Sequence, residues 1–110
     1  MDISLIIPVY NEEGNLRLLY QELKPPLDSL GEDYEIIFVD DGSNDNSPII
    51  LDDLAKKDKK IKVIHLDGNY GVTSTLSVGL SYAKGDFILT MDADLQYNCR
   101  ELVRITQELK

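Results

Sequence analysis

Cysteine and long apolar runs are what this sequence has least of. Its one cysteine, Cys99, has no second cysteine with which to form an internal disulfide. No run approaches the roughly 20 apolar residues that span a bilayer, and the N-terminus lacks the basic stretch and apolar core of a secretion signal. We therefore expect a cytoplasmic protein without a transmembrane segment. Contact with the cytoplasmic face of a membrane would then need a missing segment or a partner.

Basic residues are also scarce. The 110 residues include 11 lysines and arginines against 20 aspartates and glutamates, which gives a formal charge of -9. This balance excludes nucleic acid and anionic lipid as the main electrostatic partners, whereas an acidic surface suits divalent cations. The hydrophobic fraction of 43% is enough for one core at this length, so we expect a single domain over residues 1–110.

Four short apolar runs, each ending in polar or glycine-rich residues, predict four β-strands. They are Ile3–Val9, Tyr34–Val39, Lys62–Leu66 and Asp86–Met91. A segment with helical spacing of apolar residues follows each run, and this alternation predicts an α/β fold with a mainly parallel sheet. The carboxyl ends of all strands then meet at one edge, where open sheets of this kind bind ligands.

The four expected helices have apolar residues three and four positions apart. They are marked by Leu16, Leu19, Tyr20 and Leu23; by Ile50, Leu51 and Leu54; by Leu76, Gly79, Leu80 and Ala83; and by Leu102, Ile105, Thr106 and Leu109. Pro25 and Pro26 should end the first helix and begin a loop that runs to Gly31. Gly85 should close the third helix.

The triplet Asp92–Asp94 is the sharpest candidate for chemistry. Two carboxylates separated by one small residue at a strand end can both turn toward one cation, and such oxygen ligands suit Mg²⁺ or Mn²⁺. The ion would bridge the carboxylates to a diphosphate and stabilise a leaving nucleotide. The alternative is a strand-to-helix turn in which Asp94 lies near a helix cap.

Two further turns carry polar residues at the same edge. Asp40 and Asp41 precede Gly42, which allows a tight turn against a flat ligand, and one acid could accept hydrogen bonds from a ribose or base. We favour this role for Asp41, whereas residues 43–45 fit equally well as an N-capping turn of the second helix. Residues 68–71 match no phosphate-loop pattern and are interpreted as a helix-entry turn.

His65 and Cys99 are interpreted as structural residues. The histidine, the sole one in the chain, lies within an apolar strand and is expected to be hydrogen-bonded rather than catalytic. Cys99 has no histidine or second cysteine near it in the sequence, and free cysteines usually behave as small hydrophobic residues.

Taken together, four ordered motifs resemble family-2 glycosyltransferases with the GT-A fold, especially the polyprenyl-phosphate sugar synthases. The motifs are Ile6–Glu12, Val39–Ser43, Gly85–Asp86 and Met91–Gln96. The resemblance covers practically the whole chain but only the N-terminal, donor-binding part of the family's catalytic domain. It implies a truncated Rossmann-like GT-A domain, with a sheet of about four strands flanked by helices, whose acceptor half is missing.

The resemblance also implies a set of site residues. Nucleotide contacts would come from Pro8, Tyr10, Glu12, Val39 and Asp41, while Asp92, Ala93, Asp94 and Gln96 would surround the diphosphate and the metal. Asp92 and Asp94 are the expected metal ligands, with Asp94 the leading one, and the cofactor would be Mg²⁺ or Mn²⁺. Val72 departs from the pattern, because many relatives carry a lysine or another polar residue there.

The activity implied by the resemblance is transfer of a hexose from a UDP- or GDP-sugar to an acceptor such as a polyprenyl phosphate. One alternative is a non-catalytic module that binds nucleotide and transfers nothing. A phospho-accepting receiver domain fits poorly, because its acids should follow the first and third strands and its lysine a fifth strand. We also expect self-association through an exposed edge of the fourth strand or an apolar face.

Overall fold

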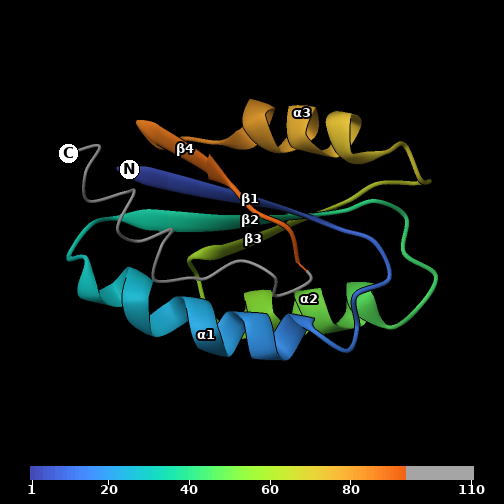
Figure 1. Ribbon diagram of the computed structural model, residues 1–110, viewed down its shortest axis with the longest axis horizontal. Coiled ribbons are helices and arrows are strands. Elements are labelled where there is room, and N and C mark those ends of the chain that lie inside the picture. Colours follow the sequence, from blue (N-terminus) through green and yellow to red (C-terminus); the bar gives the residue numbers. More distant parts are fainter. Residues whose placement is uncertain (94–110) are drawn as a thin grey trace.

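The computed structural model describes residues 1–93, in which strands and helices alternate along the chain (Figure 1). The strands are β1 (Ile3–Val9), β2 (Tyr34–Asp40), β3 (Ile61–His65) and β4 (Phe87–Thr90), and the helices are α1 (Leu16–Ser29), α2 (Ser47–Lys57) and α3 (Val72–Tyr82). Each predicted strand is confirmed to within one residue at either end. The fourth predicted helix and Cys99 lie outside the described residues.

The four described strands form one parallel sheet in the order β3-β2-β1-β4. β1 is central, since Ile3 pairs with Tyr34 of β2 on one side and with Phe87 of β4 on the other. Every side chain of β2 is buried, as expected for a strand covered on both faces. The predicted parallel α/β sheet is therefore confirmed.

Helices cover both faces of this sheet, with α1 and α2 below it and α3 above it in Figure 1. Alternate residues of β1 divide between the two layers. Leu5 and Ile7 belong to the larger core under α1 and α2, whereas Ile6 belongs to a smaller core that includes Ile37 and Val39. The regular alternation of inward side chains along the strand thus supplies both cores.

The prediction that Pro25 and Pro26 end the first helix is wrong, because α1 continues through both prolines to Ser29. Each proline removes one helical hydrogen bond. The extra turn nevertheless buries Leu27, which continues the buried stripe of the helix and is 1% exposed. Burying a leucine side chain contributes about 2 kcal/mol, enough to offset much of that loss.

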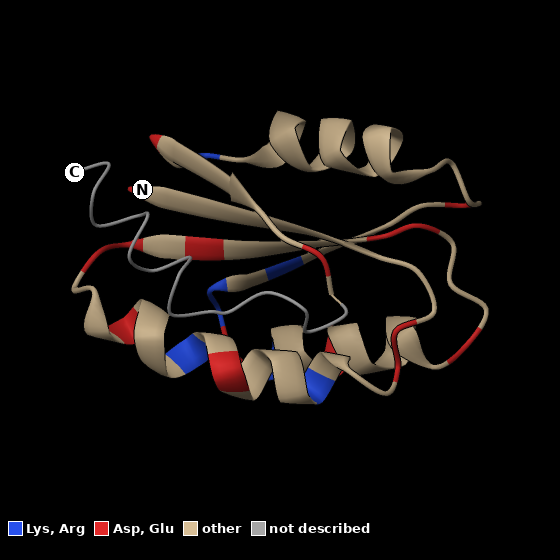
Figure 2. Ribbon diagram, in the orientation of Figure 1, with Lys and Arg blue, Asp and Glu red and all other residues tan. Residues whose placement is uncertain are grey.

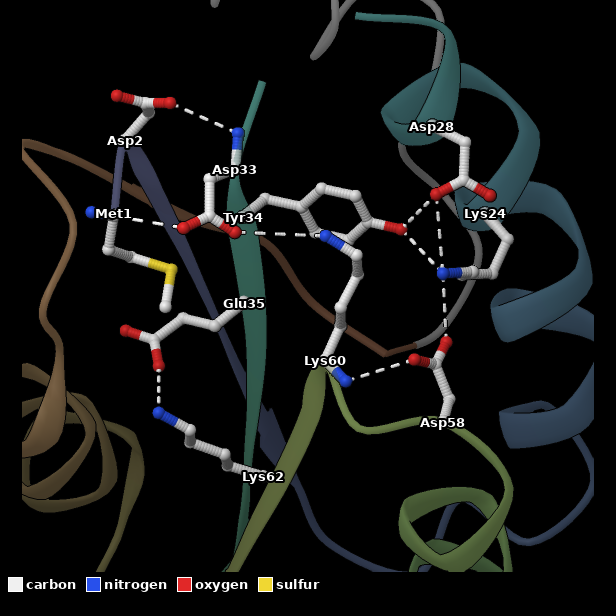
Figure 3. A network of polar contacts seen from close by, with 10 residues as sticks. All are labelled: Met1, Asp2, Lys24, Asp28, Asp33, Tyr34, Glu35, Asp58, Lys60 and Lys62. Atoms are coloured by element: carbon white, nitrogen blue, oxygen red, sulfur yellow. Dashed lines mark hydrogen bonds and ion pairs between the residues drawn. The ribbon is translucent and has the colours of Figure 1, made fainter. Parts of the chain in front are cut away.

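Polar contacts also hold this last turn of α1 against the sheet (Figure 3). The Lys24 ammonium lies 2.8 Å from Asp58, which follows α2, and donates to the Tyr34 hydroxyl of β2 at 2.6 Å. That hydroxyl in turn donates to Asp28 at 2.5 Å. Burial and the Asp28 hydrogen bond raise the pKa of Tyr34 to about 12, so the phenol keeps its proton at neutral pH.

The buried face of α3 differs in part from the prediction. Gly79 is buried as expected, and an added Cβ would lie 2.5 Å from Ile6 Cγ2, so the glycine sets how closely α3 packs on β1. Leu80, however, is 56% exposed, because the inward side of the helix is formed by Thr75 and Gly79. Leu80 therefore does not share the buried face with Gly79, although the sequence placed both on one side of the helix.

Gly85 has a packing role instead of closing the third helix, which ends at Tyr82. A Cβ at Gly85 would lie 2.5 Å from the backbone nitrogen of Ser4, and the Gly85 N–H donates to the Ser4 hydroxyl at 2.8 Å. The segment before β4 can therefore approach β1 closely only without a side chain at this position.

Glu35 forms a buried polar cluster at the amino-terminal half of the sheet, far along the strands from their carboxyl ends. Its carboxylate is 1% exposed and accepts hydrogen bonds from Ser4 Oγ at 2.6 Å, Lys62 Nζ at 2.6 Å and the Lys84 N–H at 2.8 Å. Figure 3 shows Lys62 reaching Glu35 from the neighbouring strand. Burial acts to raise the pKa of Glu35, but these hydrogen bonds outweigh it and lower the pKa.

Candidate functional site

A cavity of about 190 Å³ lies between the carboxyl ends of β1 and β4. It is lined by Pro8, Val9, Tyr10, Glu12, Asp41, Val72, Thr75, Asp92 and Ala93. The strand order reverses here, because the chain runs from β1 outward to β2 and β3 and then returns to β4 on the other side of β1. Parallel α/β sheets bind ligands at this kind of crossing point.

Most of the predicted site residues in the described part of the chain meet at this cavity. Six of them line it, namely Pro8, Tyr10, Glu12, Asp41, Asp92 and Ala93. Val39 does not, since its side chain is fully buried in the core beneath α3. Asp94 and Gln96 lie outside the described residues, and the ligand contacts of the whole set stay predictions.

Asp41 joins the end of β2 to the start of α3. Its two carboxylate oxygens accept hydrogen bonds from the Tyr70 N–H at 2.7 Å and the Gly71 N–H at 2.9 Å. Gly71 is the N-cap of α3 and has φ +96°, a conformation that favours glycine. Residues 68–71 are thus a helix-entry turn, as predicted, and each Asp41 oxygen keeps a lone pair for a ligand.

The turn after β2 is fastened to the segment after β1. The Asn11 N–H donates to Ser43 Oγ at 3.0 Å, and the Asn44 N–H donates back to Asn11 Oδ1 at 2.7 Å. Asn11 has φ +53°, which asparagine tolerates better than most residues. These reciprocal bonds place Tyr10, which is 43% exposed, beside the turn that carries Asp41.

A second pair of contacts continues this connection at the start of α2. The Glu12 N–H donates to Ser47 Oγ at 2.9 Å, and Asp45 accepts both the Ser47 N–H at 2.8 Å and the Glu13 N–H at 3.2 Å. Within the predicted capping turn, Asp45 therefore bonds the first turn of α2, while Ser43 and Asn44 bind Asn11 instead. Glu12, which lines the cavity, is thereby tied to the start of α2.

Three lining residues, Val9, Val72 and Thr75, were not predicted as site residues. Thr75 is fully buried and its hydroxyl donates to the Val72 carbonyl oxygen at 2.7 Å, within the first turn of α3. The helix begins right after the Asp41-bound turn, so its first residues necessarily face the strand ends. One feature of the sequence could have identified Val72 as a site residue: it follows Gly71 directly, at a position where many relatives carry a lysine or another polar residue.

A wider hollow of about 590 Å³ adjoins the cavity on the β3 side and shares Tyr10 with it. Asp40, Asp52, His65 and Asp67 contribute ionisable side chains to its lining. His65 contacts both Asp40 and Asp52, which confirms the expected hydrogen-bonded histidine. Gly42 closes the turn here with φ +72°, and its added Cβ would lie 2.6 Å from the Gly68 carbonyl carbon.

The loops around both hollows carry negative charge only (Figure 2). Residues 10–15, 40–46, 66–71 and 91–93 contain seven carboxylates, at positions 12, 13, 40, 41, 45, 67 and 92, and neither lysine nor arginine. Asp92 is exposed at the cavity and offers the hard oxygen that Mg²⁺ and Mn²⁺ prefer. Within residues 1–93, no three histidine, cysteine or acidic side chains gather as a complete metal site.

Comparison with known proteins matches this chain to a known family. The family described as "Glycosyl transferase family 2" matches residues 4–110. Undecaprenyl-phosphate 4-deoxy-4-formamido-L-arabinose transferases from Edwardsiella ictaluri and Aeromonas hydrophila are each 40% identical over 106 residues, or 96% of this chain. These matches cover 33% and 32% of the two relatives, so the chain spans about a third of their length.

Solved structures share the fold as well. The structure of S. aureus TarS in complex with UDP-GlcNAc matches with a TM-score of 0.78 at 29% identity, over 98% of this chain and 30% of that one. The predicted GT-A fold is thereby confirmed. Among the helices of residues 1–93, none has the length and apolar character needed to cross a membrane.

Proposed function

Because this chain belongs to glycosyl transferase family 2, we propose that it forms the donor-binding part of an enzyme that transfers a sugar from a UDP- or GDP-sugar to a polyprenyl phosphate. We take a hexose as the transferred sugar. The two relatives are named for undecaprenyl phosphate as their acceptor and a modified arabinose as their sugar, which supports a polyprenyl phosphate here. The TarS complex holds UDP-GlcNAc, which makes UDP the first nucleotide to test.

The observation that carries this proposal is the convergence of the six predicted residues at the crossing point of the sheet. A volume of about 190 Å³ is below the roughly 300–1,000 Å³ of ordinary ligand pockets. A nucleotide sugar would therefore be enclosed only in part, and the adjoining hollow that shares Tyr10 offers further room.

The charge of this edge supports a divalent metal. A nucleoside diphosphate is an anion, and the described lining of the cavity supplies carboxylates without lysine or arginine to neutralise it. A cation between the diphosphate and Asp92 and Asp94 would resolve this repulsion. When bound, Mg²⁺ or Mn²⁺ would neutralise the diphosphate and act as a Lewis acid for the departing nucleotide.

The protein's own residues would bind and orient the donor. The half-exposed ring of Tyr10 offers a flat apolar face for a base or a ribose. Asp41 has spare lone pairs and is held rigidly by two backbone amides, so it can accept a hydrogen bond without rearranging. The nucleophile would be the phosphate oxygen of the acceptor, which is anionic and needs no base in this chain to activate it.

The test is a calorimetric titration of the chain with UDP and with GDP, each with and without Mn²⁺. We expect metal-dependent binding of one nucleotide, abolished in Asp92→Asn and kept in Asp53→Asn, which removes a carboxylate on α2 away from the cavity. Binding of neither nucleotide would refute the donor site. Turnover of UDP-hexose and UDP-pentose donors with a polyprenyl phosphate then separates an active transferase from a module that only binds nucleotide.

A further inference from the structure

Both ring nitrogens of His65, the last residue of β3, face carboxylate oxygens. Nδ1 lies 2.9 Å from Asp40 Oδ2 at the end of β2, and Nε2 lies 2.7 Å from Asp52 Oδ1 on α2. An ionised carboxylate only accepts hydrogen bonds, so both contacts are satisfied only when both nitrogens carry a proton. A neutral ring satisfies one contact and turns a lone pair toward the other carboxylate.

The surroundings of His65 favour its charged form. Burial acts to lower its pKa, but the hydrogen bonds with Asp52 and Asp40 outweigh this and raise the pKa above its usual value of about 6.5. Asp67, which follows β3, adds a third carboxylate to the lining of the same hollow, and the described lining has no lysine or arginine. The imidazolium is therefore the only cation in this part of the described chain.

Asp40 connects His65 to the turn that carries Asp41. While Asp40 Oδ2 contacts the histidine, Oδ1 accepts the Ser43 N–H at 3.0 Å, and the Asp40 backbone oxygen accepts the Leu66 N–H at 2.9 Å. The carboxylate is 4% exposed, so water does not readily replace these partners. The orientation of the 40–43 turn thus depends on the same carboxylate that the histidine holds.

We propose that protonated His65 is a positioning residue that fixes the 40–43 turn through Asp40, and with it Asp41 at the cavity. Its effect on nucleotide binding rests on the proposed function. Since the pKa of His65 is raised on folding, the arrangement is complete below about pH 6.5 and is lost as the pH rises through the raised value. When the ring loses one proton, a single N–H is left for the two carboxylates, so Asp40 is held only while the proton is on Nδ1, and the turn is fixed less firmly.

The sole histidine of the chain makes a direct test simple. We would follow the His65 ring protons and the Ser43 amide by NMR from pH 5.5 to 9 without nucleotide. The ring should titrate above pH 6.5, and the Ser43 amide should shift with the same midpoint. A Ser43 amide that does not change across the titration of the ring would overturn the proposal.

Two variants at position 65 test whether the positive charge of the side chain fixes the turn. His65→Arg keeps a positive charge and several N–H donors at every pH, so its Ser43 amide should stay as in the acidic wild type. His65→Gln lacks the charge and should resemble the alkaline wild type throughout. A wild-type pH response that persists in His65→Arg would contradict the mechanism, and if either variant fails to fold, the wild-type titration still decides.

Nucleotide binding gives the functional consequence. Between pH 6 and pH 9 the affinity for UDP with Mn²⁺ should fall roughly three- to tenfold more in the wild type than in His65→Arg. The comparison cancels the titration of the nucleotide and the metal, because both proteins see the same buffer. Absence of binding at every pH, with the Ser43 response intact, would count against the proposed function and leave the positioning role standing.

Discussion

Replacing Glu35 with alanine should destabilise the fold strongly without altering the cavity. Two of its three donors, Ser4 Oγ and the Lys84 N–H, bond the same oxygen, Oε2, the first in a buried contact and the second in a partly buried one. The third donor, Lys62 Nζ, bonds Oε1, and because the lysine side chain is 40% exposed, its ammonium group is hydrated again when the glutamate is removed. At about 1.5 kcal/mol, the low end for a hydrogen bond to a charged group, the Ser4 and Lys84 contacts make Glu35→Ala cost about 3 kcal/mol.

Urea unfolding followed by circular dichroism measures this cost. With an m value of about 1.5 kcal/mol/M, the midpoint should fall by about 2 M. Glu35→Gln is the matched control, because its amide oxygen can occupy the Oε2 position and keep the Ser4 and Lys84 donors, so it should cost about 1 kcal/mol. A loss below about 1 kcal/mol in Glu35→Ala, or equal losses in both variants, would refute the hydrogen-bond explanation and favour the Lys62 ion pair.

The same residue gives a prediction for acid. Because the pKa of Glu35 is lowered on folding, its stabilisation is present above its unfolded value of about 4.3 and is lost as the pH falls through the folded value. Glu35→Gln removes that contribution, so its stability should fall less than that of the wild type over this range. Parallel acid-unfolding curves for the two proteins would contradict it.

Three further substitutions test other parts of the fold and the site. Asp94→Ala should abolish metal-dependent nucleotide binding in calorimetry while leaving folding largely intact, and unchanged affinity would remove Asp94 from the metal site. Gly85→Ala places a Cβ 2.5 Å from the β1 backbone, so Tm should fall by about 10 °C in calorimetric scans, and an unchanged Tm would contradict the close packing. Pro25→Ala restores a donor inside α1 and should stabilise the chain by about 1 kcal/mol in urea, whereas a loss would show that the proline suits its place.

Strands and their order along the chain could be predicted from the sequence, because continuous apolar runs bounded by glycine and aspartate mark buried parallel strands. The extent of α1 could not. A proline inside a helix is unfavourable locally, and here Leu27 and the Lys24–Asp28–Tyr34 contacts outweigh that preference. Those contacts depend on β2, which lies beyond the reach of any local pattern.

The candidate site, too, could be predicted from the sequence only in part. Aspartates after β2 and β4 could be placed at one edge, since parallel strands share their direction. Nothing in the sequence indicated that Asp41 binds the backbone amides of residues 70 and 71, or that His65 joins Asp40 to Asp52. Such contacts arise only when loops from different β-α units meet, and neither spacing nor composition reports on that.

The position of β4 beside β1 also fixes when the cavity forms during folding. Residues up to the end of β3, with α1 and α2, supply three neighbouring strands and most of the larger core early in synthesis. β4 arrives last among the described strands, and it must pair with the first, a slow step because the intervening chain has to be closed into a loop. Tyr10 and Asp92 come together only at that step, so the ability to bind a ligand between them reports that β4 has joined the sheet.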